Sequence, residues 1–295
     1  MAGLKIIKKR IGSVKNIRKI TKTMELVSAA KSRKMMVRVH DSQPYGNKMA
    51  DLLGTLSGVT GELDLPLLRI TDQPKKIILL VVTANRGLCG GYNAQLLKMA
   101  RHRIKELQDS KIPFDLHVIG KKGLAYFKFI DVAVSKSWVD FDDNFDYTSA
   151  QSLAKEYVSG FINQDFDRLE LISTRYISAS VQRADLFSIL PMAQSAAKGD
   201  ATSPAGTTKP ANIIFEPSAE DILKTLLPHM AEYIFYKTIL EAVTSEQIAR
   251  RIAMKAASDA AGDMNKSLTR IYNRKRQAAI TQELAEIVAG ADAIK

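Results

Sequence analysis

The chain has little of what most catalytic and metal sites require. It contains one cysteine, Cys89, and four histidines that stand far apart (His40, His102, His117 and His229). A single cysteine excludes an internal disulfide and fits a reducing compartment. Histidines at such distances lack the spacing of a metal site. The sequence therefore predicts no catalytic group, metal site or cofactor, and Cys89 is expected to be a buried structural thiol, with a reactive thiol as the alternative.

Long apolar runs are also missing. None reaches the ~20 residues of a membrane span, and the first residues lack the apolar core of a secretory signal. A basic, acid-poor start is also typical of organelle transit peptides, but here an apolar stripe at helical spacing continues through it and indicates structure. The stripe comprises Ile6, Ile7, Ile11, Val14, Ile17, Ile20, Met24 and Val27. We expect a soluble bacterial protein.

Acidic residues are nearly absent from the first forty positions. Twelve Lys or Arg stand there against one acid, Glu25, in a chain of net charge +12. A solvated helix normally mixes both signs, so this excess of positive charge indicates an acidic or polar counterpart. Nucleic acid or an anionic membrane surface is one such counterpart. However, Met1 to His40 holds no aromatic residue that could stack on bases.

Proline and glycine are absent from long stretches at both ends. Ser13 to Gln43 has neither, which predicts a helix that ends near Pro44, with a looser extension from Asn47 to Leu56. His229 to Ala289 has only one glycine, Gly262, and predicts a second long helix. Ser218 is its expected N-cap, and Pro228 is expected to kink or restart it.

Small residues on the second helix indicate a partner helix. Ala249, Ala253, Ala256 and Ala260, beside Ile248 and Ile252, recur at steps of three and four and predict a narrow seam. The ends of the chain should therefore form an antiparallel coiled coil. The pattern fails between Arg270 and Gln277, so this polar turn is expected to face something else.

The middle of the chain predicts a three-layer α/β domain with a mostly parallel sheet, because strand and helix patterns alternate there. Strands are expected at Lys76–Thr83, Asp115–Ile119, Asp131–Ser135, Leu169–Ser178 and Val181–Leu190, and helices at Tyr92–Leu107, Lys121–Phe129 and Thr148–Phe161. The fold class is thus α/β, a long antiparallel coiled coil with an inserted Rossmann-like domain. The domain limits are predicted as 1–56 for the first helix, 74–195 for the α/β domain, 196–217 for a linker and 218–295 for the last helix.

One loop of the α/β domain lies where such folds bind phosphates. Asn85 to Gly91 (NRGLCGG) follows a strand and precedes a helix, yet it matches neither dinucleotide nor P-loop fingerprint. Its residues Arg86, Gly87, Cys89, Gly90 and Gly91 remain candidates, although a tight turn explains the glycines more simply. The acids Asp140, Asp142 and Asp143 are expected to form a solvated loop.

Several separated motifs resemble those of one known family, the gamma subunit of F-type ATP synthases. The motifs are ITKTMELV at 20–27, RGLCGG at 86–91, SEQIAR at 245–250, YNRKRQAAITQEL at 272–284 and EIVAGA at 286–291. They stand in the family's order and cover nearly the whole chain. The resemblance departs from the family pattern at Gln43, Ala260 and Arg251, and no cysteine pair is present for the redox switch of chloroplast relatives.

The resemblance implies a rotor. In that family the two terminal helices form a shaft inside a ring of alpha and beta subunits, and the globular domain lies with epsilon near the membrane ring of c subunits. Proton flow turns the c ring and the shaft, and the catalytic subunits make ATP; hydrolysis reverses the sense. The implied protein is a non-catalytic subunit, one copy per hetero-oligomer, peripheral on the cytoplasmic face of the bacterial inner membrane, without a nucleic-acid partner.

The resemblance also implies which residues touch the catalytic ring. Basic side chains of the first helix would face an acidic segment of the beta subunits, and the second helix would contribute coupling residues. The implied ring contacts are Met24, Lys9, Lys19, Lys22, Arg250, Arg274, Gln277, Thr281 and Glu283. Ile287, Val288 and Ile294 would form an apolar tip in its bearing. For Met24, packing in the seam is the alternative. For the whole chain, the alternatives are a basic coiled coil that binds nucleic acid or a membrane, and an enzyme built on the α/β domain.

Overall fold

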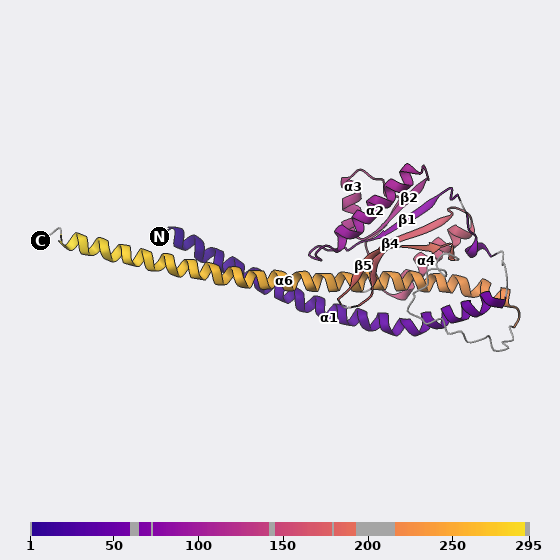
Figure 1. The fold of residues 1–295 in the computed structure, drawn as a ribbon, viewed down its shortest axis with the longest axis horizontal. Coiled ribbons are helices and arrows are strands. Elements are labelled where there is room, and N and C mark those ends of the chain that lie inside the picture. Colours follow the sequence, from indigo (N-terminus) through magenta and orange to yellow (C-terminus); the bar gives the residue numbers. More distant parts are fainter. Residues whose placement is uncertain are drawn as a thin grey trace. The chain divides into compact units, whose positions relative to one another are not determined.

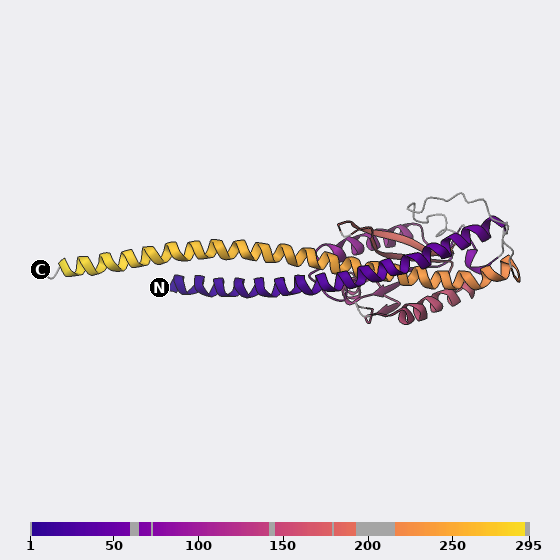
Figure 2. The ribbon, with the colours of Figure 1, turned by 90° about the horizontal axis from the view of Figure 1, so that it is seen from below.

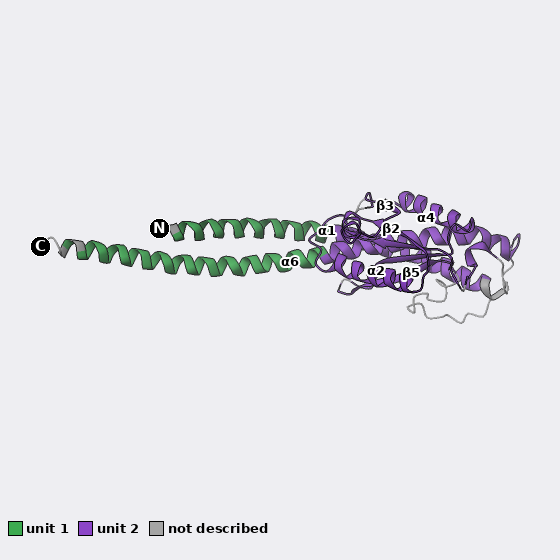
Figure 3. Cartoon of the chain, turned by 90° about the horizontal axis from the view of Figure 1, so that it is seen from above, with its two compact units in different colours: residues 1–30, 250–295 green, residues 31–249 purple. Residues whose placement is uncertain are grey.

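The computed structural model describes residues 2–59, 65–71, 73–141, 145–178, 180–192 and 216–292. The chain divides into two compact units, coloured separately in Figure 3. Unit 1 comprises residues 1–30 and 250–295, and unit 2 comprises residues 31–249. Asp142, Asp143, Ile294 and nearly all of the predicted linker lie outside the described residues.

Unit 2 is built on a five-stranded sheet in the order β3-β2-β1-β4-β5. The strands are β1 (Ile77–Val82), β2 (Phe114–Ile119), β3 (Lys136–Trp138), β4 (Arg168–Tyr176) and β5 (Gln182–Leu190). The first four run parallel and β5 pairs antiparallel with β4. This is the predicted α/β sheet with its closing strand pair.

Helices cover both faces of this sheet, which confirms the three-layer prediction (Figure 1). α2 (Tyr92–Asp109) and α3 (Lys121–Phe129) lie on one face, and α4 (Tyr147–Ile162) lies on the other with parts of the long helices. A short 3-10 helix, η1, spans Pro66–Leu68. Central strand β1 is buried along its whole length, so its alternate side chains enter two separate cores.

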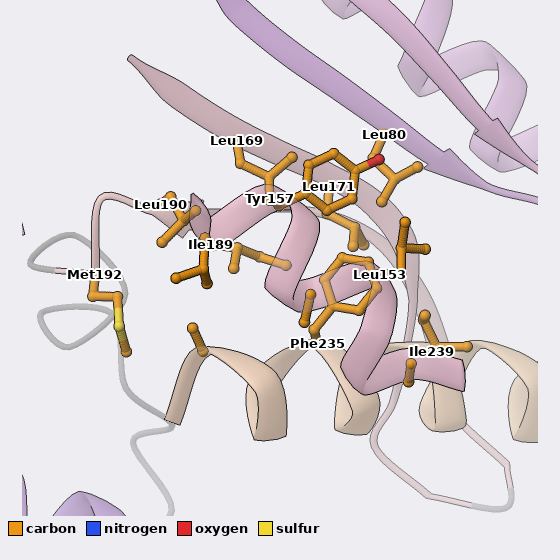
Figure 4. Close-up of a cluster of buried hydrophobic side chains, with 14 of the residues drawn as sticks. Leu80, Leu153, Tyr157, Leu169, Leu171, Ile189, Leu190, Met192, Phe235 and Ile239 are labelled. Carbon is orange, nitrogen blue, oxygen red and sulfur yellow. The ribbon is translucent and has the colours of Figure 1, made fainter. Parts of the chain in front are cut away.

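The larger core lies between the sheet, α4 and the long helices (Figure 4). Phe235 and Ile239 of the last helix pack there against Tyr157 and Leu153 of α4, beneath Leu171 of β4. Burying one such side chain contributes about 1.5 to 3 kcal/mol. This core therefore ties the second half of the chain to the sheet.

The first helix, α1 (Ala2–Val59), is longer than predicted. The prediction that it ends near Pro44 is wrong, because the helix passes through that residue. Tyr233 packs at this point: its hydroxyl donates to the carbonyl of Ser42 at 2.7 Å, and its ring meets Tyr45 edge-on at 5.2 Å between centroids. A Cβ at Gly46 would overlap the Tyr233 ring. Tertiary packing therefore holds the helix together across a residue that removes one backbone donor.

The last helix, α6 (Ala219–Asp292), is continuous across Pro228, so the prediction of a restart there is wrong. The N-cap prediction is confirmed, because the Ser218 hydroxyl accepts from the backbone N–H of Asp221 at 3.1 Å. Within unit 2, residues 31–59 of α1 lie beside the first part of α6 (Figure 2).

The predicted position of the third strand is wrong by a few residues. Asp131–Ser135 is irregular, and the strand is Lys136–Trp138. Asp131 has a positive φ of 55° and Val132 donates back to the carbonyl of Phe127 at 3.0 Å, so these residues close the C-terminus of α3. The alternating valines that suggested a strand belong to this helix end.

Candidate functional site

The glycine loop between β1 and α2 is a structural connection. The backbone N–H of Ala84 donates to Asn93 Oδ1 at 3.0 Å, and Asn85 Nδ2 donates to the carbonyl of Val139 at 2.8 Å. Asn85 Oδ1 in turn accepts from the backbone N–H of Lys121 at 3.0 Å. The loop side chains thus join the carboxyl ends of three neighbouring strands.

Backbone conformation explains part of the loop's composition. Gly90 has φ 59°, a region that glycine reaches without strain, and Leu88 shares it at φ 64°. Cys89 is only 2% exposed, and its Sγ accepts from Asn93 Nδ2 at 3.3 Å. This confirms that the thiol is buried. Arg86 and Gly91 are exposed, Gly87 is half-buried, and Gly90 is exposed.

The crevice where a doubly wound fold takes a nucleotide lies between the carboxyl ends of β1 and β4, since the strand order reverses there. Here α6 approaches both strand ends. The Tyr92 hydroxyl, just after the loop that follows β1, donates to the carbonyl of Ala242 at 3.1 Å. At the end of β4, the N–H of Tyr176 donates to Glu241 Oε2 at 3.3 Å. A carboxylate and a packed helix at this position disfavour a phosphate, which weakens the nucleotide-enzyme alternative.

Two further absences concern only the part of the chain that the structure describes. It brings together no group of three or more His, Cys, Asp or Glu side chains that could hold a metal ion. None of its helices combines the length and the apolar composition that crossing a membrane requires.

In unit 1 the two long helices pack along a seam that repeats every seven residues. On α1, the buried or half-buried positions include 4, 7, 11, 14, 21, 25 and 28, which follow steps of three, of four, or of their sum, seven. On α6 the corresponding positions are 254, 258, 261, 265, 268 and 272. This spacing is that of a coiled coil. The apolar end of the seam holds Leu4, Ile7, Ile11 and Val14, whereas Thr21, Glu25 and Ser28 make its other end polar.

The predicted alanine seam is wrong in detail. Ile248 is buried and Ala249 and Ala253 are half-buried, but Ile252, Ala256 and Ala260 are exposed. The actual seam contains Met254, Ser258 and Asn265, which the pattern of small apolar residues did not include. The buried positions of α6 thus follow the seven-residue period of a coiled coil, whereas the alanines of the predicted seam do not.

The apolar stripe of α1 is also only partly structural. Ile7, Ile11 and Val14 face the seam, while Ile17, Ile20 and Val27 are 51%, 59% and 49% exposed. Leu26 is 60% exposed. Sequence periodicity located this apolar face but could not tell that the helix pair leaves half of it open. Leu26 lies on another side of the helix, and we call Ile17, Ile20 and Val27 the open apolar face.

Basic side chains flank the open apolar face. Lys9 and Lys19 are exposed, as is Lys22, whose Nζ pairs with Glu25 at 3.1 Å. Met24 is half-buried, which is compatible with both of its predicted roles, contact with the catalytic ring and packing in the seam. A salt bridge with an exposed lysine contributes about 1 kcal/mol or less, so Lys22 can exchange partners.

The candidate residues on α6 differ in exposure. Arg250 is 6% exposed, whereas Arg274, Gln277, Thr281 and Glu283 are exposed. In the polar turn Arg270–Gln277, Ile271 and Tyr272 are half-buried and the others are exposed. Ile287 and Val288 are 67% and 60% exposed. Except for Arg250, the residues of α6 that the family resemblance singles out are therefore available to another protein.

Comparison of the sequence with known proteins identifies the family of this chain. The family model described as ATP synthase matches residues 3–294. The ATP synthase gamma chain of Leptospira biflexa is 45% identical over 294 residues, and that of Geotalea daltonii is 40% identical over 295, each match covering both chains completely. The chain belongs to the ATP synthase gamma chain family.

Chains in solved structures share this fold. A chain of the Euglena gracilis mitochondrial ATP synthase, in a structure of its OSCP, F1 and c-ring, matches with a TM-score of 0.67 at 18% identity. The match covers 99% of this gamma chain and 95% of the other. A chain from the central stalk and c-ring of the Tetrahymena thermophila enzyme matches with a TM-score of 0.56 at 20% identity, covering 81% and 99%.

Proposed function

We propose that this chain is the central rotor shaft of a bacterial ATP synthase. It couples proton-driven rotation of the membrane c ring to ATP synthesis, or to hydrolysis in reverse, in a ring of alpha and beta subunits. The full-length likeness to curated gamma chains carries the proposal. Solved structures of similar fold, one of a central stalk with c-ring and one of a rotor, support it.

The chain transmits torque and carries out no bond chemistry. The exposed faces of unit 1 suit that role: the open apolar face of α1 and the neighbouring Lys9, Lys19 and Lys22 contact the alpha and beta subunits. On α6, Arg274, Gln277, Thr281 and Glu283 make the ring contacts, and Ile287 and Val288 form the apolar tip. Arg250, being buried, acts through its neighbours within the chain.

Charge attraction and apolar contact have different roles on this surface. Lysines on flexible stems attract an acidic partner without requiring one fixed register, and apolar side chains exclude water where the surfaces meet. A shaft that meets successive subunits needs contacts that do not depend on one fixed register. Unit 2 lies outside the ring with epsilon and the c ring, and the complex is peripheral on the cytoplasmic face of the inner membrane with one copy of this chain.

Reconstitution with alpha and beta subunits tests the proposal. Mixing the three chains is expected to give a stable complex with ATPase activity and one copy of this chain. Replacing Lys9, Lys19 and Lys22 together by Gln should slow association at least about tenfold at low salt and much less at high salt, because steering by charge is screened.

The chain offers a matched control. Lys98, Arg101 and Lys105 form an exposed basic ridge on α2 in unit 2. Replacing these three by Gln removes the same charge and should leave association with alpha and beta within about twofold, since the ridge lies on unit 2. Failure of the unaltered chain to assemble would sink the proposal. Equal effects of the two triple variants would show that net charge alone matters.

A further inference from the structure

One polar atom in unit 1 is buried and has no hydrogen-bond partner among the described residues: the side-chain oxygen of Asn265. Asn265 occupies a seam position of α6, between Ala261 and Leu268 in the seven-residue pattern. Leaving a buried acceptor unsatisfied is costly. A single asparagine in a coiled-coil seam is also a well-attested way to fix how two helices face each other.

A cation lies one helical turn away. An ideal Cβ built at Gly262 would be 3.4 Å from Arg18 Nε and 3.5 Å from its Cζ, so the guanidinium lies across the glycine. Gly262 and Asn265 are three residues apart on one face of α6, where Cβ positions are about 5 to 6 Å from each other. The Arg18 guanidinium forms no ion pair or hydrogen bond within the described part of the chain.

Neighbouring donors are already engaged. The Thr269 hydroxyl donates to the backbone carbonyl of Asn265 at 2.8 Å, and Lys266 Nζ bonds Asp263 at 3.3 Å. The Thr21 hydroxyl donates to the backbone carbonyls of Ile17 and Arg18, both at 3.1 Å. Arg18, with five donors and no partner, is the best placed to reach the open oxygen.

We propose that Arg18 of α1 donates to the side-chain oxygen of Asn265 of α6, and that this cross-helix bond fixes how the two helices of unit 1 face each other. Gly262 leaves the space through which the guanidinium crosses, since a long side chain there would displace it. Arg18 is thus a positioning residue, and this role holds whatever unit 1 binds.

The composition of the seam explains the need. Beyond Val14 the seam positions of α1 are Thr21, Glu25 and Ser28, and Arg18, between Val14 and Thr21, is exposed. These residues provide little apolar area to favour one facing over another. Apolar packing is weakly directional, whereas a bond between one donor and one acceptor has a single geometry. The Arg18–Asn265 bond therefore sets the facing where the apolar seam ends.

A double-mutant cycle read by hydrogen exchange of the full chain tests the bond. Arg18→Ala and Asn265→Ala should each lower amide protection in residues 10–25 and 258–272 about fivefold, and the double variant should lower it no further, because both changes remove one interaction. Lys5→Ala with Lys255→Ala, exposed positions on the same helices, should leave protection within about twofold. Additive effects of Arg18→Ala and Asn265→Ala, near 25-fold together, would overturn the proposal.

A charge change gives a readout that general loss of packing does not move. Asn265→Asp places a carboxylate where Arg18 can reach it and should raise protection about fivefold at pH 7, since bonds between ionised groups are stronger. The gain should vanish below pH 4 and should be absent when Arg18 is Ala. Lower protection from Asn265→Asp, or the same change with and without Arg18, would contradict the proposal.

Discussion

Unit 2 and unit 1 use apolar side chains in opposite ways. In unit 2, Phe127, Phe161 and Phe235 are almost completely buried, and two cores cover both faces of the sheet. In unit 1, Ile17, Ile20, Leu284 and Ile287 are all more than half exposed. Unit 2 therefore carries its own stabilising contacts, while unit 1 keeps apolar area open for contact with other subunits. A rotor needs both: a rigid body to be turned and a surface that turns against its neighbours.

The largest effect is expected from a core residue of unit 2. Phe235→Ala should lower the free energy of unfolding by about 3 to 5 kcal/mol, because Phe235 is 1% exposed and its removal leaves a cavity between α6 and α4. Urea denaturation of the isolated chain, followed by the near-UV signal of Trp138, measures it. A loss below about 1 kcal/mol would contradict the tight core assigned to unit 2.

A smaller effect is expected at Gly46, where Tyr233 of α6 packs against α1 in unit 2. Gly46→Ala should cost about 2 kcal/mol, since the added Cβ overlaps the Tyr233 ring. The same change combined with Tyr233→Ala should cost less than the two single changes together, because the clash is removed. Additivity in the same denaturation assay would show that the close approach is not what destabilises the variant.

Acid should weaken unit 2 through His117. Burial, and then the charge of Lys136, lower the pKa of this histidine to about 4, and its Nδ1 lies 2.9 Å from the Tyr157 hydroxyl. Between pH 6.5 and 4 the unfolded chain takes up a proton that the folded chain refuses, so stability falls as pH falls. The loss should be about 2 kcal/mol between pH 7.5 and pH 5. His117→Gln is the control: its unfolding free energy should lack this part of the pH dependence, and an identical slope would refute the assignment.

The smallest effect on stability is expected in unit 1, and it sharpens the contrast. Ile20→Ala should change the unfolding free energy by less than about 0.5 kcal/mol, because the side chain is 59% exposed. The same variant should weaken association with alpha and beta subunits, measured by titration, about tenfold. Val14→Ala, in the seam at 8% exposure, is the matched control. It should lower the unfolding free energy more than Ile20→Ala does and should weaken association with alpha and beta subunits less.

Sequence reasoning reached the fold through residues with strong local preferences. The run KIILLVVT could be placed within a residue, because a strand buried on both faces is a continuous run rich in β-branched residues. The pair of strands near the end of the α/β domain was placed within two residues. Helix continuity at Pro44 could not be predicted, because it depends on Tyr233, far away in the sequence. Strand β3 was displaced for a similar reason, since the end of α3 uses the residues whose alternation suggested a strand.

The candidate site also has features that the sequence predicts and features that depend on tertiary packing. The exposure of Arg274, Gln277 and Glu283 follows from a polar stretch on a long helix, which sequence shows directly. The apolar stripe of α1 was predicted to be structural, yet part of it stays open, because periodicity reports that a face is apolar but not whether a partner within the chain covers it. Motifs shared with the gamma chain family, rather than any chemical pattern, carried the functional prediction.

Rotation itself is the most direct test of the central claim. Because Cys89 is buried, a cysteine introduced at exposed Lys128 of α3 gives a single reactive position for a probe on unit 2. In a complex with alpha and beta subunits fixed to a surface, ATP should drive stepwise rotation of that probe in one direction. An assembled complex that hydrolyses ATP while the probe stays still would contradict the account.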